Sequence, residues 1–371
     1  MPLRRLPRVL VTAFFAVSLF SVRIATVRAQ IDPQTALLER EGWAALASGN
    51  ARVAADAFRQ ALTADPKRAR LHLGAAMAAA LDRRDDDAMA SCERALALDP
   101  SLVEGRALLG QLLYRRHDLT GAIRVYESLV ADHPDDEVKR SVQPTLDRWQ
   151  RELELHDRMQ QAIGSHFTVS FEGPAEADLA ERSLAVLDRA YWRVGQILST
   201  YPSEPIAVVL YTSEQFRDIT RSPSWAAGAY DGTIRVPVRG ALDKPEELER
   251  VLSHEFTHAL IRTLATSGVP TWLNEGLAVA LETGDAPDQK PSGNEPTVPL
   301  RLLSGGFGRL NARDAQLAYD ASARGARRLL DEAGGMAVAN LLRDLGEGVD
   351  FERAFAHRIQ QSFADFDAAG R

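Results

Sequence analysis

The chain has little cysteine and no excess of basic charge. Cys92 is the only cysteine in 371 residues, so no internal disulfide can form and the core must hold the fold. Lysine and arginine total 44 against 51 acidic residues, which gives a formal net charge of −7 at pH 7. No dense block of lysine and arginine interrupts this acidity. Because polyanions repel an acidic protein, we expect no nucleic-acid partner.

Long apolar runs are also missing, apart from one near the N-terminus. Residues 9–22 are largely apolar and follow three arginines, but the run is shorter than the ~20 residues that a transmembrane helix needs. This pattern predicts a signal peptide over residues 1–29, cleaved after Ala29. The corresponding expectation is export, to the periplasm or cell envelope of a bacterium. Arg23 and Arg28 make the cleavage region unusually basic, so an uncleaved membrane anchor is the alternative.

Residues 35–136 repeat with a period of 34. Small, bulky and proline positions recur in three columns: Ala54, Ala88 and Ala122; Phe58, Cys92 and Tyr126; Pro66, Pro100 and Pro134. A further small position of each first helix holds Gly42, Ala76 or Gly110. Small residues where helices cross, a bulky residue four positions after one of them, and a proline at the end of each unit resemble the tetratricopeptide repeat. The alternative is an alanine-rich bundle without superhelical register.

The resemblance implies an all-α solenoid whose concave groove takes a peptide of a protein partner. Its last repeat would leave an apolar end, and residues 137–163 are predicted to cover that end as one amphipathic helix, with Pro144 as a point of interruption. Cys92 falls in the bulky column of the repeat, so we expect it to be a core residue and not a reactive thiol.

The second half contains a candidate metal site. His254 and His258 are four residues apart, so on a helix both imidazoles face the same side. Glu255 lies between them, where a carboxylate can serve as general base and acid. A catalytic zinc ion needs a third protein ligand, and Glu275 on a following helix is the candidate. The alternative is that both histidines are satisfied core residues and Glu255 is exposed.

The motif His-Glu-x-x-His followed by Trp-Leu-Asn-Glu-Gly-Leu-Ala resembles the gluzincin metallopeptidases, in particular the short bacterial domains described as peptidase MA-like. The resemblance covers residues 165–371. It implies that His254, His258 and Glu275 bind zinc, that a water is the fourth ligand, and that Glu255 is the catalytic acid and base. A phrase similar to the family's Ala-Tyr-x-x-Ser segment implies that Tyr319 donates to the oxyanion.

The chain departs from the family pattern after Glu275. The spacer from His258 to Glu275 is shorter than in thermolysin, and Val279 stands where thermolysin-like enzymes carry a carboxylate that orients a histidine. Glu282 is the only carboxylate left on that face. The family's exopeptidase motif is absent, so the resemblance does not imply amino-terminal trimming.

The remaining pattern predicts an α+β domain with a small sheet. Strands are expected at 166–171 and 206–211, and residues 228–238 are expected to form another strand pair or an edge strand. Residues 229–234 are either a substrate-binding edge or an ordinary one. Helices are expected at 175–200, 213–219, 316–332, 336–345 and 351–366. Residues 284–299 are rich in Gly and Pro and predict a loop, as a lid over the site or as an inert insertion.

The sequence therefore predicts a tetratricopeptide solenoid followed by a zincin-like domain that hydrolyses peptide bonds in a peptide or protein substrate. Membrane association is expected only if the N-terminal segment stays uncleaved. Two alternatives stay open. In one, the repeats bind a partner and the zinc site is catalytically silent; in the other, the substrate is a peptidoglycan cross-link.

The N-terminus offers a first test. If residues 1–29 are a cleaved signal, protein recovered from the cell envelope should begin at Gln30 and be released by osmotic shock. N-terminal sequencing of that fraction checks it. Recovery of a chain that begins at Met1 in the membrane pellet would show an anchor instead.

Overall fold

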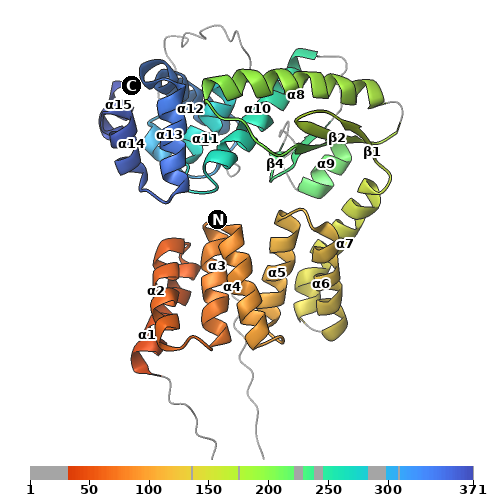
Figure 1. The fold of residues 1–371 in the computed structure, drawn as a ribbon, viewed down its shortest axis with the longest axis vertical. Helices are drawn as coiled ribbons and strands as arrows, with labels where there is room; N and C mark the ends of the chain where they lie inside the picture. The colour runs from red at the N-terminus through yellow and green to blue at the C-terminus, as the bar shows by residue number, and fades with distance from the viewer. Residues whose placement is uncertain are drawn as a thin grey trace, which may run out of the picture.

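The computed structural model describes residues 32–134, 137–173, 176–220, 229–237, 245–282, 298–307 and 310–370 (Figure 1). The predicted signal peptide and residues 284–297 of the predicted loop lie outside these ranges. A helical solenoid forms one half of the molecule, a mixed α and β half lies above it in Figure 1, and one helix leads from the first half to the second. In the described part of the chain, no helix is long and apolar enough to cross a bilayer.

The solenoid consists of three helix pairs, as the period of 34 predicts. They are α1 (Pro33–Ala47) with α2 (Ala51–Ala64), α3 (Ala69–Leu81) with α4 (Asp85–Leu98), and α5 (Val103–Arg115) with α6 (Leu119–Asp132). Several helices begin where a short polar side chain accepts from a free backbone N–H: Asp32 from Thr35, Asn50 from Val53, and Asp118 from Gly121.

Close packing inside the repeats explains the small and bulky columns. A Cβ on Gly42 would lie 2.7 Å from the Phe58 ring, and one on Gly110 would lie 2.4 Å from the Tyr126 ring. In the second repeat the small position is Ala76, and the bulky position holds the small Cys92, both fully buried in one cluster. A larger residue in the small column is thus accompanied by a smaller residue in the bulky column, so the packed volume is kept. Burial raises the pKa of the Cys92 thiol to about 11, consistent with a core residue.

Helix α7 (Glu137–His156) covers the last repeat and continues without interruption through Pro144. Its Trp149 lies against the rings of Tyr114 and Tyr126, at centroid distances of 5.0 and 4.6 Å. The predicted helix over 137–163 was wrong at its end, because residues 160–163 form a strand. That strand pairs with residues 168–171 of the sheet. Helical periodicity in the sequence does not predict hydrogen bonds between strands.

The sheet has five strands in the order β1-β2-β3-β5-β4: β1 (Gln160–Ile163), β2 (Phe167–Phe171), β3 (Ile206–Tyr211), β4 (Ala229–Tyr230) and β5 (Ile234–Pro237). The three central strands are parallel, and the two outer pairings are antiparallel. Phe167, Val169 and Phe171 point into the core, as their alternation predicts. β4 lies at one edge of the sheet, in the segment predicted as an edge.

The other helices pack against this sheet and against each other. They are α8 (Ala177–Ile197), α9 (Ser213–Thr220), α10 (Pro245–Leu264), α11 (Thr271–Ala280), the short 3₁₀ helix η2 (Leu300–Leu302), α12 (Ala312–Ala333), α13 (Gly335–Gly346), α14 (Phe351–Ile359) and α15 (Phe363–Ala369). The single helix predicted over 351–366 was wrong. Gln360 has a left-handed backbone (φ 63°), and the Ser362 side chain caps the next helix, so the chain breaks between α14 and α15.

A buried polar network joins the two halves. Arg235 of β5 donates to Glu152 of α7 and to the Tyr211 hydroxyl, both at 2.8 Å. Tyr114 of α5 donates to the second oxygen of Glu152, also at 2.8 Å. The Glu152 and Arg235 side chains are 1% and 6% exposed. Because a buried charge needs its partner, this network fixes the solenoid against the sheet.

We expect Glu152→Ala to lower the free energy of unfolding by about 3 kcal/mol, since it removes the buried partner of the Arg235 charge and leaves only the more exposed Asp231, at 3.3 Å, to pair with it. Urea unfolding followed by tryptophan fluorescence measures the change. Asp218→Ala is a matched control, because it breaks the exposed Arg151–Asp218 pair (3.0 Å) and should cost at most about 1 kcal/mol. Equal losses in the two variants would show that the buried network does not hold the halves together.

Candidate metal centre

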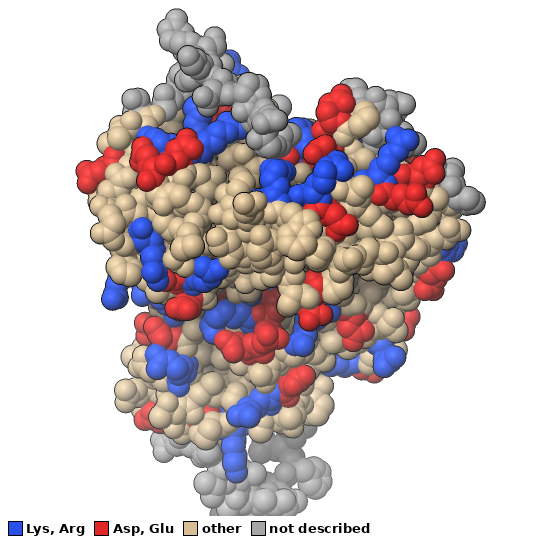
Figure 2. All heavy atoms as spheres, turned by 45° about the horizontal axis from the view of Figure 1, so that its top comes forward, with Lys and Arg blue, Asp and Glu red and all other residues tan. Residues whose placement is uncertain are grey.

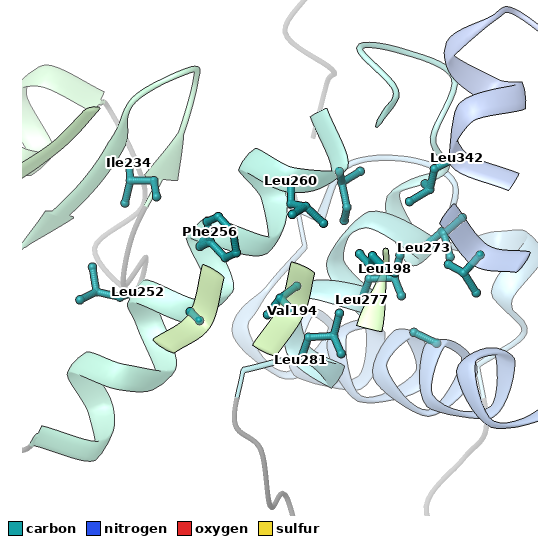
Figure 3. Close-up of a cluster of buried hydrophobic side chains, with 14 of the residues drawn as sticks. Val194, Leu198, Ile234, Leu252, Phe256, Leu260, Leu273, Leu277, Leu281 and Leu342 are labelled. Carbon is teal, nitrogen blue, oxygen red and sulfur yellow. The ribbon is translucent and has the colours of Figure 1, made fainter. Parts of the chain in front are cut away.

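Helix α10 provides both histidines because its two faces differ. Leu252, Phe256 and Leu260 lie on the face that packs into the core (Figure 3). His254 and His258 project from another face into a cavity. A turn at residues 265–270 ends α10, and α11 then packs against it, with Glu275 in its middle.

The three predicted ligands come together. The Nε2 atoms of His254 and His258 are 3.1 Å apart, and Glu275 Oε2 lies 3.8 Å from the first and 3.6 Å from the second. One ligand atom from each residue lies within 4.8 Å of the other two. Two ligands of one tetrahedral zinc ion, each bound at about 2.0–2.1 Å, lie about 3.3 Å apart. The spacing of these donors therefore fits one zinc ion.

The protonation of His258 also suits a ligand. Burial, and then the charge of His254, lower the pKa of His258 to about 3, so its imidazole is neutral at pH 7. Its Nδ1 atom is buried and has no hydrogen-bond partner among the residues that the structure describes. The other ring nitrogen, Nε2, is the one that faces His254 and Glu275.

Glu282 orients His254. Its Oε1 lies 2.9 Å from His254 Nδ1, so the ring presents Nε2 to the other ligands. Arg250 lies 3.4 Å from both oxygens of Glu282. The sequence singled out Glu282 as the carboxylate available on this face but gave it no role. The contact depends on how the chain turns after α11 ends at Ala280, which periodicity does not predict.

Glu255 is buried beside the ligands, contrary to the alternative in which it is exposed. It is 5% exposed, and its Oε2 has no hydrogen-bond partner within the described ranges. Burial, together with the charges of Glu275 and Glu282, raises its pKa to about 7, against the opposing effect of His254. A carboxyl group with a pKa near neutrality and a free oxygen is suited to general acid and base chemistry.

Tyr319 reaches the same cavity from α12. Burial and then the acidic charges of Glu275 and Glu255 raise the pKa of its phenol well above its usual value, so it stays a hydrogen-bond donor at pH 7. Its position depends on Gly276 of α11, where a Cβ would lie 2.3 Å from the Ser322 carbonyl oxygen. The glycine thus lets α11 and α12 approach closely.

The cavity has a volume of about 950 Å³ and contains every predicted site residue. Both halves of the molecule line it, because Leu81, Asp82 and Arg83 of the α3–α4 loop face the ligands across the opening. In Figure 2 the boundary between the halves is hollowed, and charged side chains of both signs gather along it. The sequence did not predict a wall built by the solenoid.

Comparison with known proteins supports the repeats. Residues 39–103 match a family described as tetratricopeptide repeat. Ten chains of solved structures match, among them the Sgt2 TPR domain from Aspergillus fumigatus, with 25% identity over 36% of this chain and 88% of that chain and a TM-score of 0.31. The search of curated proteins found no match. The repeats therefore indicate a protein-interaction module, and the family match ends well before the ligand cluster.

Ligand variants test the metal site. Purified protein should hold about one zinc ion per chain, and His258→Ala or Glu275→Ala should release it, because two protein ligands hold zinc poorly. Glu282→Gln should weaken zinc binding by about 10- to 100-fold, since the orienting hydrogen bond changes. Metal content after dialysis against a competing chelator measures both effects.

Glu249→Gln is the control, because Glu249 lies on the same helix but outside the cavity lining, and its ion pair in the described ranges is with the exposed Arg189 at 3.5 Å. Its zinc affinity should equal that of the wild type. Stoichiometric zinc in both ligand variants would place the metal elsewhere.

Proposed function

We propose that this protein is a zinc metallopeptidase that hydrolyses peptide bonds in peptide or protein substrates, and that it acts outside the cytoplasm. One observation carries the proposal: His254, His258 and Glu275 converge within 4.8 Å in a cavity that also contains the buried carboxyl group of Glu255. Two histidines and a carboxylate that leave a position open are typical of catalytic zinc, not of structural zinc.

Zinc is the metal that these donors favour. Neutral imidazole nitrogens and a carboxylate oxygen at near-tetrahedral spacing suit it. The orphaned Oε2 of Glu255 beside them marks a polar group that the described residues do not satisfy. When bound, zinc would act as a Lewis acid that polarises the scissile carbonyl and makes water acidic enough to attack at neutral pH.

Glu255 is the proposed general base and acid. Its pKa near 7 allows it to accept a proton from the attacking water and to return that proton to the leaving amine. Its burial keeps competing water away from the proton. Its free Oε2 faces no protein donor among the described residues, so the oxygen is available to the water.

Tyr319 is the proposed donor to the oxyanion. Its phenol stays protonated because burial and two nearby carboxylates raise its pKa. A fixed donor in a cavity stabilises charge that develops on the carbonyl oxygen during attack.

A second candidate function follows from the repeats, which indicate protein binding. In that reading the zinc site would be silent, and the solenoid alone would recognise the partner. The unpaired oxygen of Glu255 favours the enzyme, because a buried carboxyl group without a partner destabilises the fold and a structural site does not need one. A peptidoglycan cross-link is an alternative substrate for the same chemistry.

Glu255→Gln separates the two functions. It keeps the size of the side chain but removes the base, so we expect turnover to fall by about 100-fold or more. Zinc content should be unchanged, because Glu255 is not a ligand. Tyr319→Phe should lower kcat more mildly, with little change in KM. Rates on a denatured protein substrate, with and without chelator, provide the measurement.

Glu249→Gln serves again as the control and should retain full activity. Unchanged peptidase activity in Glu255→Gln would mean that the activity comes from another site. If the zinc-loaded wild type cuts neither peptides nor cell-wall fragments, while residues 35–136 capture the same partners as the whole chain, the binding function stands instead.

A further inference from the structure

The turn inside each repeat places one residue in a left-handed backbone conformation. Gly49, Arg83 and His117 occupy this position, 34 residues apart, with φ of 79°, 58° and 65°. In each turn the next residue donates to a carbonyl five positions back, at 2.9 Å: Asn50 to Ala45, Arg84 to Ala79, and Asp118 to Leu113. This motif requires a left-handed residue and favours glycine. An arginine and a histidine there are unusual and point to a role for their side chains.

His117 docks the third repeat on the sheet. Its Nδ1 lies 3.2 Å from the Thr233 hydroxyl, and its ring lies so close to Gly232 that a Cβ there would be 2.6 Å from Nε2. The turn of the third repeat therefore contacts the turn between β4 and β5, across the boundary between the two halves. A Cβ added to Gly49, in the first repeat, would lie more than 4 Å from every neighbouring atom that the structure describes, so this position makes no such contact.

Arg83, in the second repeat, lines the cavity of the metal site. Its side chain is exposed, and within the described ranges the structure records no hydrogen bond or ion pair for it. Arg262 of α10 lines the same cavity, and its one recorded partner is Asp85 at 3.9 Å. Both guanidinium groups are thus available to a ligand.

Near Arg83 and Arg262, guanidinium groups share a carboxylate. Asp85 is shared by Arg262 and Arg115, the latter at 2.8 Å. Arg83 and Arg262 lie close enough to Arg115 to help lower its pKa, although burial is the larger cause. Asp82, which also lines the cavity, pairs with Arg84 at 3.0 Å. Two guanidinium groups therefore share one carboxylate, and Arg83 adds a third guanidinium group near Arg115.

Arg262 also lies at a useful distance from the metal ligands. It follows His254 and His258 at intervals of four residues, so all three share one face of α10. Four residues of an α-helix advance ~6 Å, which equals about two residues of an extended peptide. A group held by Arg262 would therefore belong to a substrate residue about two or three positions from the cleaved bond.

We propose that Arg83 and Arg262 form a subsite that binds a carboxylate of the substrate, either an acidic side chain or a free C-terminus. The subsite deepens the proposed peptidase function, since it names the substrate class for that cavity. Guanidinium groups bind carboxylates through paired hydrogen bonds, and two of them converging from different domains give selectivity. The solenoid then takes part in substrate selection through the turn of its second repeat.

Binding of labelled peptides to the zinc-loaded chain carrying Glu255→Gln tests the subsite without cleavage. The first set consists of short peptides with an amidated C-terminus and one Glu, placed at a different position in each peptide. The second set has Gln in place of that Glu. The third set has Gln and a free C-terminus. Fluorescence anisotropy should show about tenfold tighter binding for at least one carboxylate set, weakening as salt is added. The set that binds more tightly identifies the source of the carboxylate.

Arg83→Gly and Arg262→Gln should each abolish the preference. Arg83→Gly relieves the left-handed strain, so it should melt no lower than the parent, and lost preference cannot be attributed to unfolding. Arg116→Gln is the control, because Arg116 pairs with the exposed Asp86 outside the cavity. Equal binding of all sets, no binding at all, or a preference that survives both changes overturns the subsite. If the peptides show the preference but the wild type cleaves no substrate, the subsite is supported and the peptidase function is wrong.

Discussion

The structure depends on the division of helix α10 into two faces. Leu252, Phe256 and Leu260 anchor one face in the core, and this burial fixes the rotation of the helix about its axis. The residues of the other face, among them His254 and His258, must then project into the cavity. Since α11 packs on α10, its Glu275 can reach only the same point. The ligand geometry is thus a consequence of core packing.

A second constraint acts between the halves. The Glu152–Arg235 pair and its two tyrosine partners are buried where α5, α7 and the sheet meet. A buried ion pair contributes little net stability compared with apolar packing, but it tolerates few alternative arrangements. This network therefore specifies how the solenoid sits, and a cavity lined by both halves becomes a stable feature of the molecule.

The sequence predicted the elements whose signals are local. The period of 34 located the helix pairs, and the spacing of His254 and His258, together with Glu275, located the ligand cluster. The sequence did not predict the features that depend on contacts between residues distant in the chain. Residues 160–163 are a strand because β2 offers hydrogen bonds, and Glu282 orients His254 because the chain turns after α11. The cavity wall at Arg83 depends on the docking of two domains, which no pattern within either domain encodes.

The left-handed turns show how a repeat array becomes part of another site. The three turns have the same backbone, yet only the first uses glycine, the residue that adopts this conformation without strain. Arg83 and His117 each cost about 1–2 kcal/mol in that conformation. A domain is stabilised by only about 5–15 kcal/mol in total, so such costs persist where the side chain has a compensating contact. His117 has one in Thr233, within the chain. Arg83 has no recorded side-chain partner among the described residues, and the proposed subsite gives it one in a carboxylate of the substrate.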